Sequence, residues 1–216
     1  MHTAPYIGMS AFEVSSKPAK GCTLQPLDDG IRRTLEENGY KLEDGSPILY
    51  LSQIPKEISL YRSVDNTDLS SLADANIKVL GLRNCSCITD VSVLAESSTI
   101  ETLYLNGCNG IRDVSPLAGL KTLKTLYLSG CQHITDVSAL GKLPALEHLH
   151  LTWCIGITSV SGLETSKSLK TLHLGWSGVE DVSVLGHINT LCTVDLRGCK
   201  DVTGASLLKK VTLMVD

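Results

Sequence analysis

The chain lacks long hydrophobic runs and any excess of positive charge. No stretch of about 18 consecutive apolar residues occurs in the sequence, so no transmembrane helix is expected. Lys and Arg total 19 against 23 Asp and Glu, which gives a formal charge of −4 for the 216 residues. No broad basic surface is therefore available to neutralise a phosphate backbone. We expect neither a membrane nor a nucleic acid as a partner.

Signals for secretion and for catalysis are also missing. The opening residues MHTAPYIGMSAFEV contain neither a basic leader nor the apolar core of a signal peptide. The sequence has no phosphate loop of the G-x-x-x-x-G-K-S/T kind and no nucleophile accompanied by its own base. These absences lead us to expect a soluble, cytoplasmic protein with no enzymatic activity and no cofactor.

A repeat of 23 residues organises most of the chain. Its first apolar position recurs at steps of 23, 23, 23, 23 and 22 residues, at Ile77, Ile100, Leu123, Leu146, Leu169 and Leu191. Each unit begins with Leu-x-x-Leu-x-Leu-x-x-Cys or a near equivalent and continues with a segment such as CITDVSVL, GIRDVSPL or HITDVSAL. Such a unit holds one short alternating strand and a turn, and it cannot bury its apolar face alone. The pattern predicts stacked units whose strands form a curved parallel sheet.

The stretches LYLNGCNGIRDVSPLAGL and LYLSGCQHITDVSAL resemble leucine-rich repeats, and the resemblance covers about residues 55–213. The cysteine-containing first half is similar to eukaryotic repeats, whereas DVSPLAGL resembles the short repeats of internalins and phosphatase-regulatory proteins. The combination is similar in style to leucine-rich repeat proteins of trypanosomatids. The resemblance implies an α/β solenoid with the parallel sheet on the concave face and turns or short helices on the convex face.

The two ends of the chain differ from its middle. We expect residues 1–54 to form a non-repeat arm and cap, and residues 55–216 to form the solenoid with a closing strand near 208–213. Within the arm, residues 28–38 are expected to form a short helix that ends at Gly39. The arm is expected to pack on the solenoid or on a partner.

Three slots of the repeat are interpreted as scaffold. Cysteines in one slot are expected to be buried and free, rather than zinc ligands or disulfides: Cys85, Cys108, Cys131, Cys154 and Cys199. This usage of cysteine fits a reducing compartment. The aspartates of a second slot are expected to accept hydrogen bonds from the following backbone N–H groups, at Asp68, Asp90, Asp113, Asp136 and Asp181, with Ser159 in one unit. Alternating charges in a third slot are expected to pair between units: Lys78, Glu101, Lys124, Glu147 and Lys170.

The outward slots of the strands predict the binding surface. The central one carries Tyr104, Tyr127, His150, His173 and Asp195 on successive strands, about 4.8 Å apart. Exposed aromatic clusters mark recognition surfaces, and four of the nine Phe, Tyr and Trp residues lie in or beside this line: Tyr104, Tyr127, Trp153 and Trp176. We therefore predict that a protein partner binds at Tyr104, Tyr127, His148, His150, Trp153, His173, Trp176 and, towards the rim, Arg83, Asp195 and Arg197.

Other interpretations remain open from sequence alone. Tyr and His also suit a sheet surface without any partner. His148, His150, His173 and Asp195 are the only plausible metal ligands, although no metal site is assigned, and the imidazoles alternatively confer pH sensitivity. The main functional alternative is a structural subunit of a large cytoskeletal, flagellar or organellar assembly, with contacts through residues 1–50. A substrate adaptor, for which no F-box is recognisable, and an enzyme-regulatory subunit are further alternatives.

Overall fold

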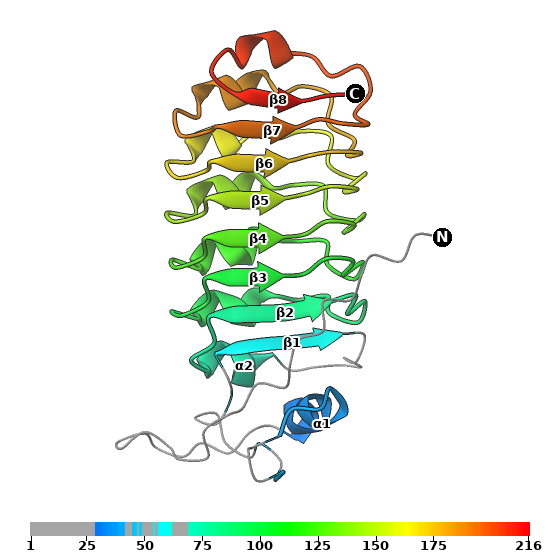
Figure 1. Ribbon diagram of the computed structural model, residues 1–216, viewed down its shortest axis with the longest axis vertical. Coiled ribbons are helices and arrows are strands. Elements are labelled where there is room, and N and C mark those ends of the chain that lie inside the picture. The colour runs from blue at the N-terminus through cyan, green and yellow to red at the C-terminus, as the bar shows by residue number, and fades with distance from the viewer. Residues whose placement is uncertain (1–28, 42–44, 47, 49–53, 55, 62–68) are drawn as a thin grey trace.

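The computed structural model describes residues 29–41, 45–46, 48, 54, 56–61 and 69–216, and the statements below concern these residues. Its strands stack in chain order into one parallel sheet of eight strands (Figure 1). The strands are β1 (Glu57–Tyr61), β2 (Val79–Arg83), β3 (Thr102–Tyr104), β4 (Thr125–Tyr127), β5 (His148–His150), β6 (Thr171–His173), β7 (Thr193–Asp195) and β8 (Thr212–Met214).

The register of the sheet follows the sequence repeat. Leu103 pairs with Leu126, Leu126 with Leu149, and Leu149 with Leu172, so residues 23 positions apart become direct neighbours. The unit that is one residue shorter does not interrupt the sheet, because Leu172 pairs with Val194, 22 residues later. The predicted stacking of the repeat units is confirmed.

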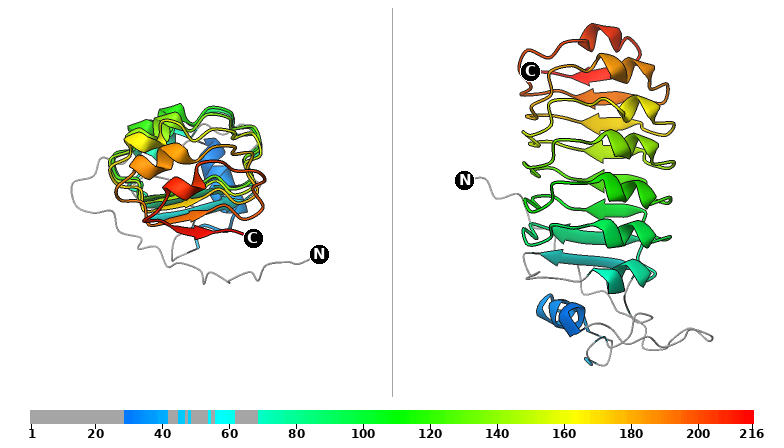
Figure 2. Two further views of the ribbon diagram at one scale, coloured as in Figure 1. Left: turned by 90° about the horizontal axis from the view of Figure 1, so that it is seen from above. Right: turned by 180° about the vertical axis from the view of Figure 1, so that it is seen from behind.

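Short helical turns close each coil on the side opposite the sheet (Figure 2). They are α2 (Ser70–Asp74), η2 (Ser92–Glu96), η3 (Ser115–Gly119), η4 (Ser138–Lys142), η5 (Leu163–Thr165), η6 (Ser183–His187) and η7 (Ala205–Leu207). The inward leucines of the strands meet the apolar residues of these turns in one continuous core. The predicted architecture, with a parallel sheet on one side and turns or short helices on the other, is confirmed. No helix within the described ranges is long and apolar enough to cross a bilayer.

The described part of the N-terminal region joins this core. Helix α1 (Asp29–Glu37) lies within the predicted range, and Gly39 follows it with a φ of +80°, a conformation that glycine adopts at little cost. Ile31 and Leu35 of α1 are buried in the same cluster as the strands. The Tyr40 hydroxyl accepts a hydrogen bond from the backbone N–H of Ser59 in β1, at 2.7 Å. The expected packing of residues 1–28 lies outside the described residues.

The aspartates before the helical turns act as expected. The Oδ1 atoms of Asp90, Asp113, Asp136 and Asp181 accept hydrogen bonds from the backbone N–H two residues later, at 2.7–2.8 Å. Ser159 Oγ does the same for Ser161, at 3.2 Å. The bond to Ser138 lowers the pKa of Asp136. The prediction is confirmed for these five positions, whereas Asp68 lies outside the described residues.

We expect Asp136→Ala to lower the free energy of unfolding by about 1 kcal/mol, because the N–H of Ser138 loses its acceptor. Urea denaturation at neutral pH measures the loss. Asp136→Asn keeps an acceptor oxygen at the same place and should lose less stability. Equal losses in both variants would show that the hydrogen bond to Ser138 does not account for the contribution of Asp136 to stability.

The cysteines of this slot are free, and four of the five are buried as expected: Cys85, Cys108, Cys131 and Cys154. No disulfide joins the described cysteines, and the thiols of Cys108, Cys131 and Cys154 donate to backbone carbonyls of the preceding coil at 2.8–3.1 Å. Burial raises the pKa of Cys108 and Cys131 to about 12 and that of Cys154 to about 11. Cys199 is only partly buried. A protonated, inaccessible thiol is a poor nucleophile, so this ladder is part of the core.

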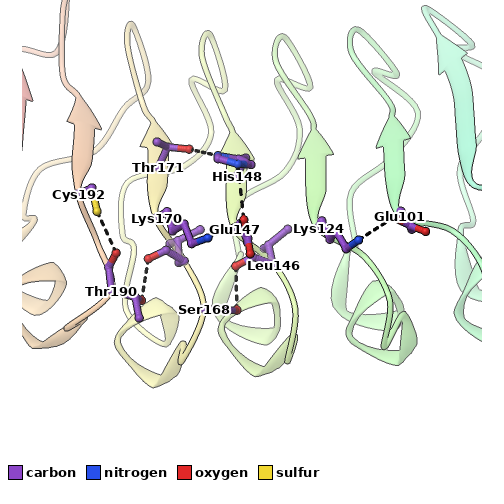
Figure 3. A network of polar contacts seen from close by, with 11 residues as sticks. Glu101, Lys124, Leu146, Glu147, His148, Ser168, Lys170, Thr171, Thr190 and Cys192 are labelled. Carbon is purple, nitrogen blue, oxygen red and sulfur yellow. Dashed lines mark hydrogen bonds and ion pairs between the residues drawn. The ribbon is translucent and has the colours of Figure 1, made fainter.

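Ion pairs connect neighbouring coils at the strand entry (Figure 3). Glu101 binds Lys78 at 2.8 Å and Lys124 at 2.7 Å, and Glu147 binds Lys170 at 2.8 Å. The expected pairing of alternating charges is confirmed at these three contacts. Exposed pairs of this kind contribute little stability.

Candidate functional site

Four rings on the outer face of the sheet form a continuous stack, which we call the ring column. Ring centroids lie 4.4 Å apart between Tyr104 and Tyr127, 4.2 Å between Tyr127 and His150, and 4.4 Å between His150 and His173. The planes of neighbouring rings differ by 7–15°. The sheet register places these residues directly opposite one another on adjacent strands. The distance between neighbouring rings is therefore set by the distance between neighbouring strands.

Arg83 extends the ring column at its N-terminal end. Its guanidinium carbon lies 3.8 Å from the centroid of the Tyr104 ring, and Nη1 donates to Ser59 Oγ at 3.0 Å. The side chain thus reaches from β1 to β3 across Gly81. A Cβ at Gly81 would lie 2.7 Å from Ser59 Oγ, so a side chain there would disturb this arrangement.

At the other end the carboxylate of Asp195 is covered. Arg197 donates to it through Nε at 2.9 Å and Nη2 at 2.8 Å, and His173 Nδ1 lies 3.6 Å away. The hydrogen bonds from Arg197 lower the pKa of Asp195 to about 2. Asp195 has the register position that the sequence indicated, but it is only 3% exposed. Arg197 and His173 therefore cover the Asp195 carboxylate, and its hydrogen bonds hold Arg197 in place. A role of Asp195 at the rim of a binding surface stays a prediction.

His148 belongs to a second line of side chains beside the ring column. In the sheet register it follows Thr125 and precedes Thr171. Figure 3 shows its ring hydrogen-bonded to the Thr171 hydroxyl and near Glu147, whose Oε2 lies 3.9 Å from Nε2. Among the residues that the structure describes, no group of three or more His, Cys, Asp or Glu side chains is placed to hold a metal ion.

Because neighbouring rings cover one another's faces, a partner can reach the ring column mainly at the ring edges. Phenol hydroxyls and imidazole nitrogens lie at those edges, and ring edges are electropositive. Burial, with a smaller contribution from His173 and His148, lowers the pKa of His150 to about 4. A neutral imidazole offers one donor and one acceptor. The column therefore offers hydrogen-bonding ring edges between two arginines, with a neutral imidazole at His150.

The lowered pKa of His150 predicts a pH-dependent stability. The unfolded chain binds a proton near pH 6.5 and the folded chain near pH 4, so the unfolded state binds more protons between these values. Stability then falls as the pH falls through this window, by about 1 kcal/mol for a half-exposed ring. Urea unfolding of the wild type and His150→Gln at about pH 7.5 and about pH 5.5 measures it. An unchanged pH dependence in the variant would contradict the assignment to His150.

Two tryptophans stack at the edge where the strands end. The ring centroids of Trp153 and Trp176 lie 5.2 Å apart with an angle of 5° between the planes. Both rings are exposed, by 53% and 39%. We call them the tryptophan pair.

The backbone under the tryptophan pair is left-handed, with φ of 63° at Trp153 and 54° at Trp176. The same slot in the other coils, here called the edge slot, shares this conformation and holds Asn84, Gly107, Gly130 and Gly198. A left-handed residue with a side chain costs about 1–2 kcal/mol, whereas a stacked aromatic pair contributes about 0.5–1.5 kcal/mol. The two left-handed positions together cost about 2–4 kcal/mol, more than the one stacked pair contributes, so stability does not explain why tryptophan replaces glycine here.

The comparisons with known proteins agree with this geometry. Residues 121–163 match a family model described as Leucine Rich repeats (2 copies). The same strand, turn and register continue through the described coils on both sides of that segment. The fold is that of a leucine-rich repeat solenoid. No curated protein sequence matches the chain.

Solved leucine-rich repeat structures resemble this solenoid in fold. An internalin (inlF) of Listeria monocytogenes has a TM-score of 0.62 and 20% identity, covering 87% of this chain and 62% of that chain. Internalin C2 (inlC2) of the same organism has a TM-score of 0.58 and 23% identity, covering 88% and 93%. The leucine-rich repeat domain of the type III effector XopL has a TM-score of 0.57 and 24% identity, covering 68% and 55%.

The sequence predicted that the two tryptophans of this leucine-rich repeat solenoid lie beside the ring column. Their left-handed backbone conformation was not predicted. The available signal was the edge slot, which reads Asn, Gly, Gly, Trp, Trp, Gly from position 84 at the repeat spacing. Asn and Gly are the residues that adopt positive φ most readily. Their recurrence in one slot indicates a left-handed turn, at which tryptophan is an exception.

Proposed function

We propose that the leucine-rich repeat solenoid is a non-catalytic module that binds a protein partner through the outer face of its sheet, the concave side of the expected architecture. One observation carries the proposal: an unbroken stack of planar side chains lies beside an exposed tryptophan pair at strained backbone positions. The proposed anchors are Tyr104, Tyr127, His150, Trp153, His173 and Trp176, with Arg83, His148 and Arg197 around them.

The size and rigidity of this surface favour a protein partner. From Arg83 on β2 to Asp195 on β7 it spans five strand steps, roughly 24 Å. The rings are already fixed by stacking, so they lose little conformational freedom on binding. Tyrosine, tryptophan and arginine are also the residues that dominate protein interfaces.

Charge is expected to act at the ends of this surface. Arg83 is bound to a hydroxyl and a ring, and no carboxylate among the described residues forms an ion pair with it. Arg197 is held by Asp195. We expect these two cations to influence the association rate of an acidic partner more than its final affinity.

The remaining features support a scaffold rather than a second activity. Protonated thiols in the coil ladder favour a reducing, cytoplasmic environment. The burial of Ile31 and Leu35 in the core of the solenoid favours residues 1–54 as its N-terminal cap, with residues 55–216 as the binding solenoid.

Affinity capture with mass spectrometry tests the proposal. Tagged wild-type protein is compared with a double variant, Tyr127→Ala with His150→Ala, and with a control, Lys142→Ala with His187→Ala, in which exposed residues of η4 and η6 are replaced. We expect at least one protein to be captured by the wild type and the control and lost from the double variant. An identical set of captured proteins in all three samples would contradict the proposal.

A further inference from the structure

Side chains of the edge slot lean towards the following coil. The Asn84 side chain lies where a Cβ of Gly107 would be, and the Trp176 ring lies where a Cβ of Gly198 would be. Trp153 stacks on Trp176 in the same direction. Each side chain in this slot therefore covers the position one coil further towards the C-terminus.

This rule leaves one gap in the middle of the edge slot. Gly107 has no side chain to cover Gly130, and a Cβ at Gly130 would find only backbone atoms of Gly107 at 3.8 and 3.9 Å. Gly130 in turn has no side chain to cover the outer face of Trp153. Among the described residues no ring or guanidinium contacts that face. From position 107, which the Asn84 amide covers, to Trp153, the edge slot contributes no side chain over two strand spacings, or roughly 10 Å.

We propose that this gap receives one aromatic side chain of the partner protein, which stacks on the open face of Trp153 above Gly130. The inference rests on the proposed function and specifies the partner's chemistry. The molecule already builds the same contact one coil further, where Trp153 stacks on Trp176. A partner ring on the open face of Trp153 would extend this stack by one ring.

The surroundings favour a ring over an isolated cation, and a ring with a polar edge over phenylalanine. The six residues of the edge slot contain no acidic side chain to neutralise a cation. The Asn84 amide at the far end of the gap offers both a donor and an acceptor. Tyrosine and tryptophan combine a stacking face with a hydrogen-bonding group, so they match both ends.

A substitution that fills the gap with a side chain of this protein tests the proposal. The edge slot already accepts tryptophan at a left-handed backbone in two coils, so the ring of Gly130→Trp should stack on Trp153. We expect this variant to bind the captured partner at least about tenfold more weakly. Lys142→Trp adds an indole on η4, on the other side of the coil, and should bind as the wild type does. Trp153→Gly restores the commonest residue of the slot, removes the platform, and should weaken binding by a similar factor.

A partner-free measurement uses the two tryptophans as reporters. The sequence contains no others, so two indole N–H signals are expected in the NMR spectrum, and Trp153→Gly assigns them. N-acetyl-tyrosinamide should shift the Trp153 signal saturably, N-acetyl-leucinamide should bind at least about tenfold more weakly, and Gly130→Trp should abolish the shift. Equal shifts from both amides, or none from either, would overturn the proposal.

The outcomes separate this inference from the proposed function. If Gly130→Trp and Trp153→Gly keep wild-type affinity while the Tyr127 and His150 double variant loses it, the aromatic insertion is wrong and the sheet-face function stands. If all of these variants bind as the wild type does, both proposals are wrong.

Discussion

Replacing Tyr127 and His150 together by alanine should weaken partner binding about 100-fold, or about 2.7 kcal/mol. Both residues lie in the middle of the ring column, where interface residues carry most of the binding energy. Their loss also leaves Tyr104 and His173 without a stacking neighbour on one side, so these two remaining anchors become less ordered. Isothermal titration calorimetry with the captured partner measures the effect.

The same double variant should remain folded, because both side chains are only half-buried on the outer face of the sheet. Loss of the ring contacts is expected to lower the free energy of unfolding by about 1–2 kcal/mol. Circular dichroism and urea denaturation establish this. The matched control with Lys142→Ala and His187→Ala should bind as the wild type does. An affinity within about twofold of the wild type, less than about 0.4 kcal/mol, would refute the role of the ring column.

Leu149→Ala should have the largest effect on stability, a loss of about 3 kcal/mol in the free energy of unfolding. Leu149 is fully buried and pairs with Leu126 on one side and Leu172 on the other. A cavity at this position loosens both coil interfaces at once, and in a solenoid each coil is stabilised mainly by its two neighbours.

Urea denaturation followed by circular dichroism measures this loss. Leu207→Ala is the matched control, since Leu207 lies in η7 and is 58% exposed. The control should change stability by about 0.5 kcal/mol or less. If the two substitutions had equal effects, position 149 would not lie in a packed core.

The sequence was sufficient to predict the fold because the repeat fixes which residues become neighbours. Once Leu103, Leu126 and Leu149 are assigned to one slot, the inward and outward positions of every strand follow from the alternation of side chains. The hydrogen bond that Asp136 makes to Ser138 was equally predictable, because it depends only on local geometry.

Features that depend on long side chains crossing between coils could not be predicted. Arg83 reaches Ser59 and Tyr104 only because Gly81 leaves room between them. Arg197 bends back over Asp195 and buries a carboxylate that the strand alternation places outward. The direction in which the edge-slot side chains lean also requires coordinates, although the left-handed turn itself has a sequence signal.

Photo-crosslinking tests most directly whether the outer face of the sheet holds a protein. Benzoylphenylalanine replaces Thr125, which lies on that face beside the ring column and leaves the column intact, or Lys142, which is exposed on η4. The account predicts a crosslink to the captured partner from position 125 and none from position 142. A crosslink from position 142 with none from position 125 would contradict it.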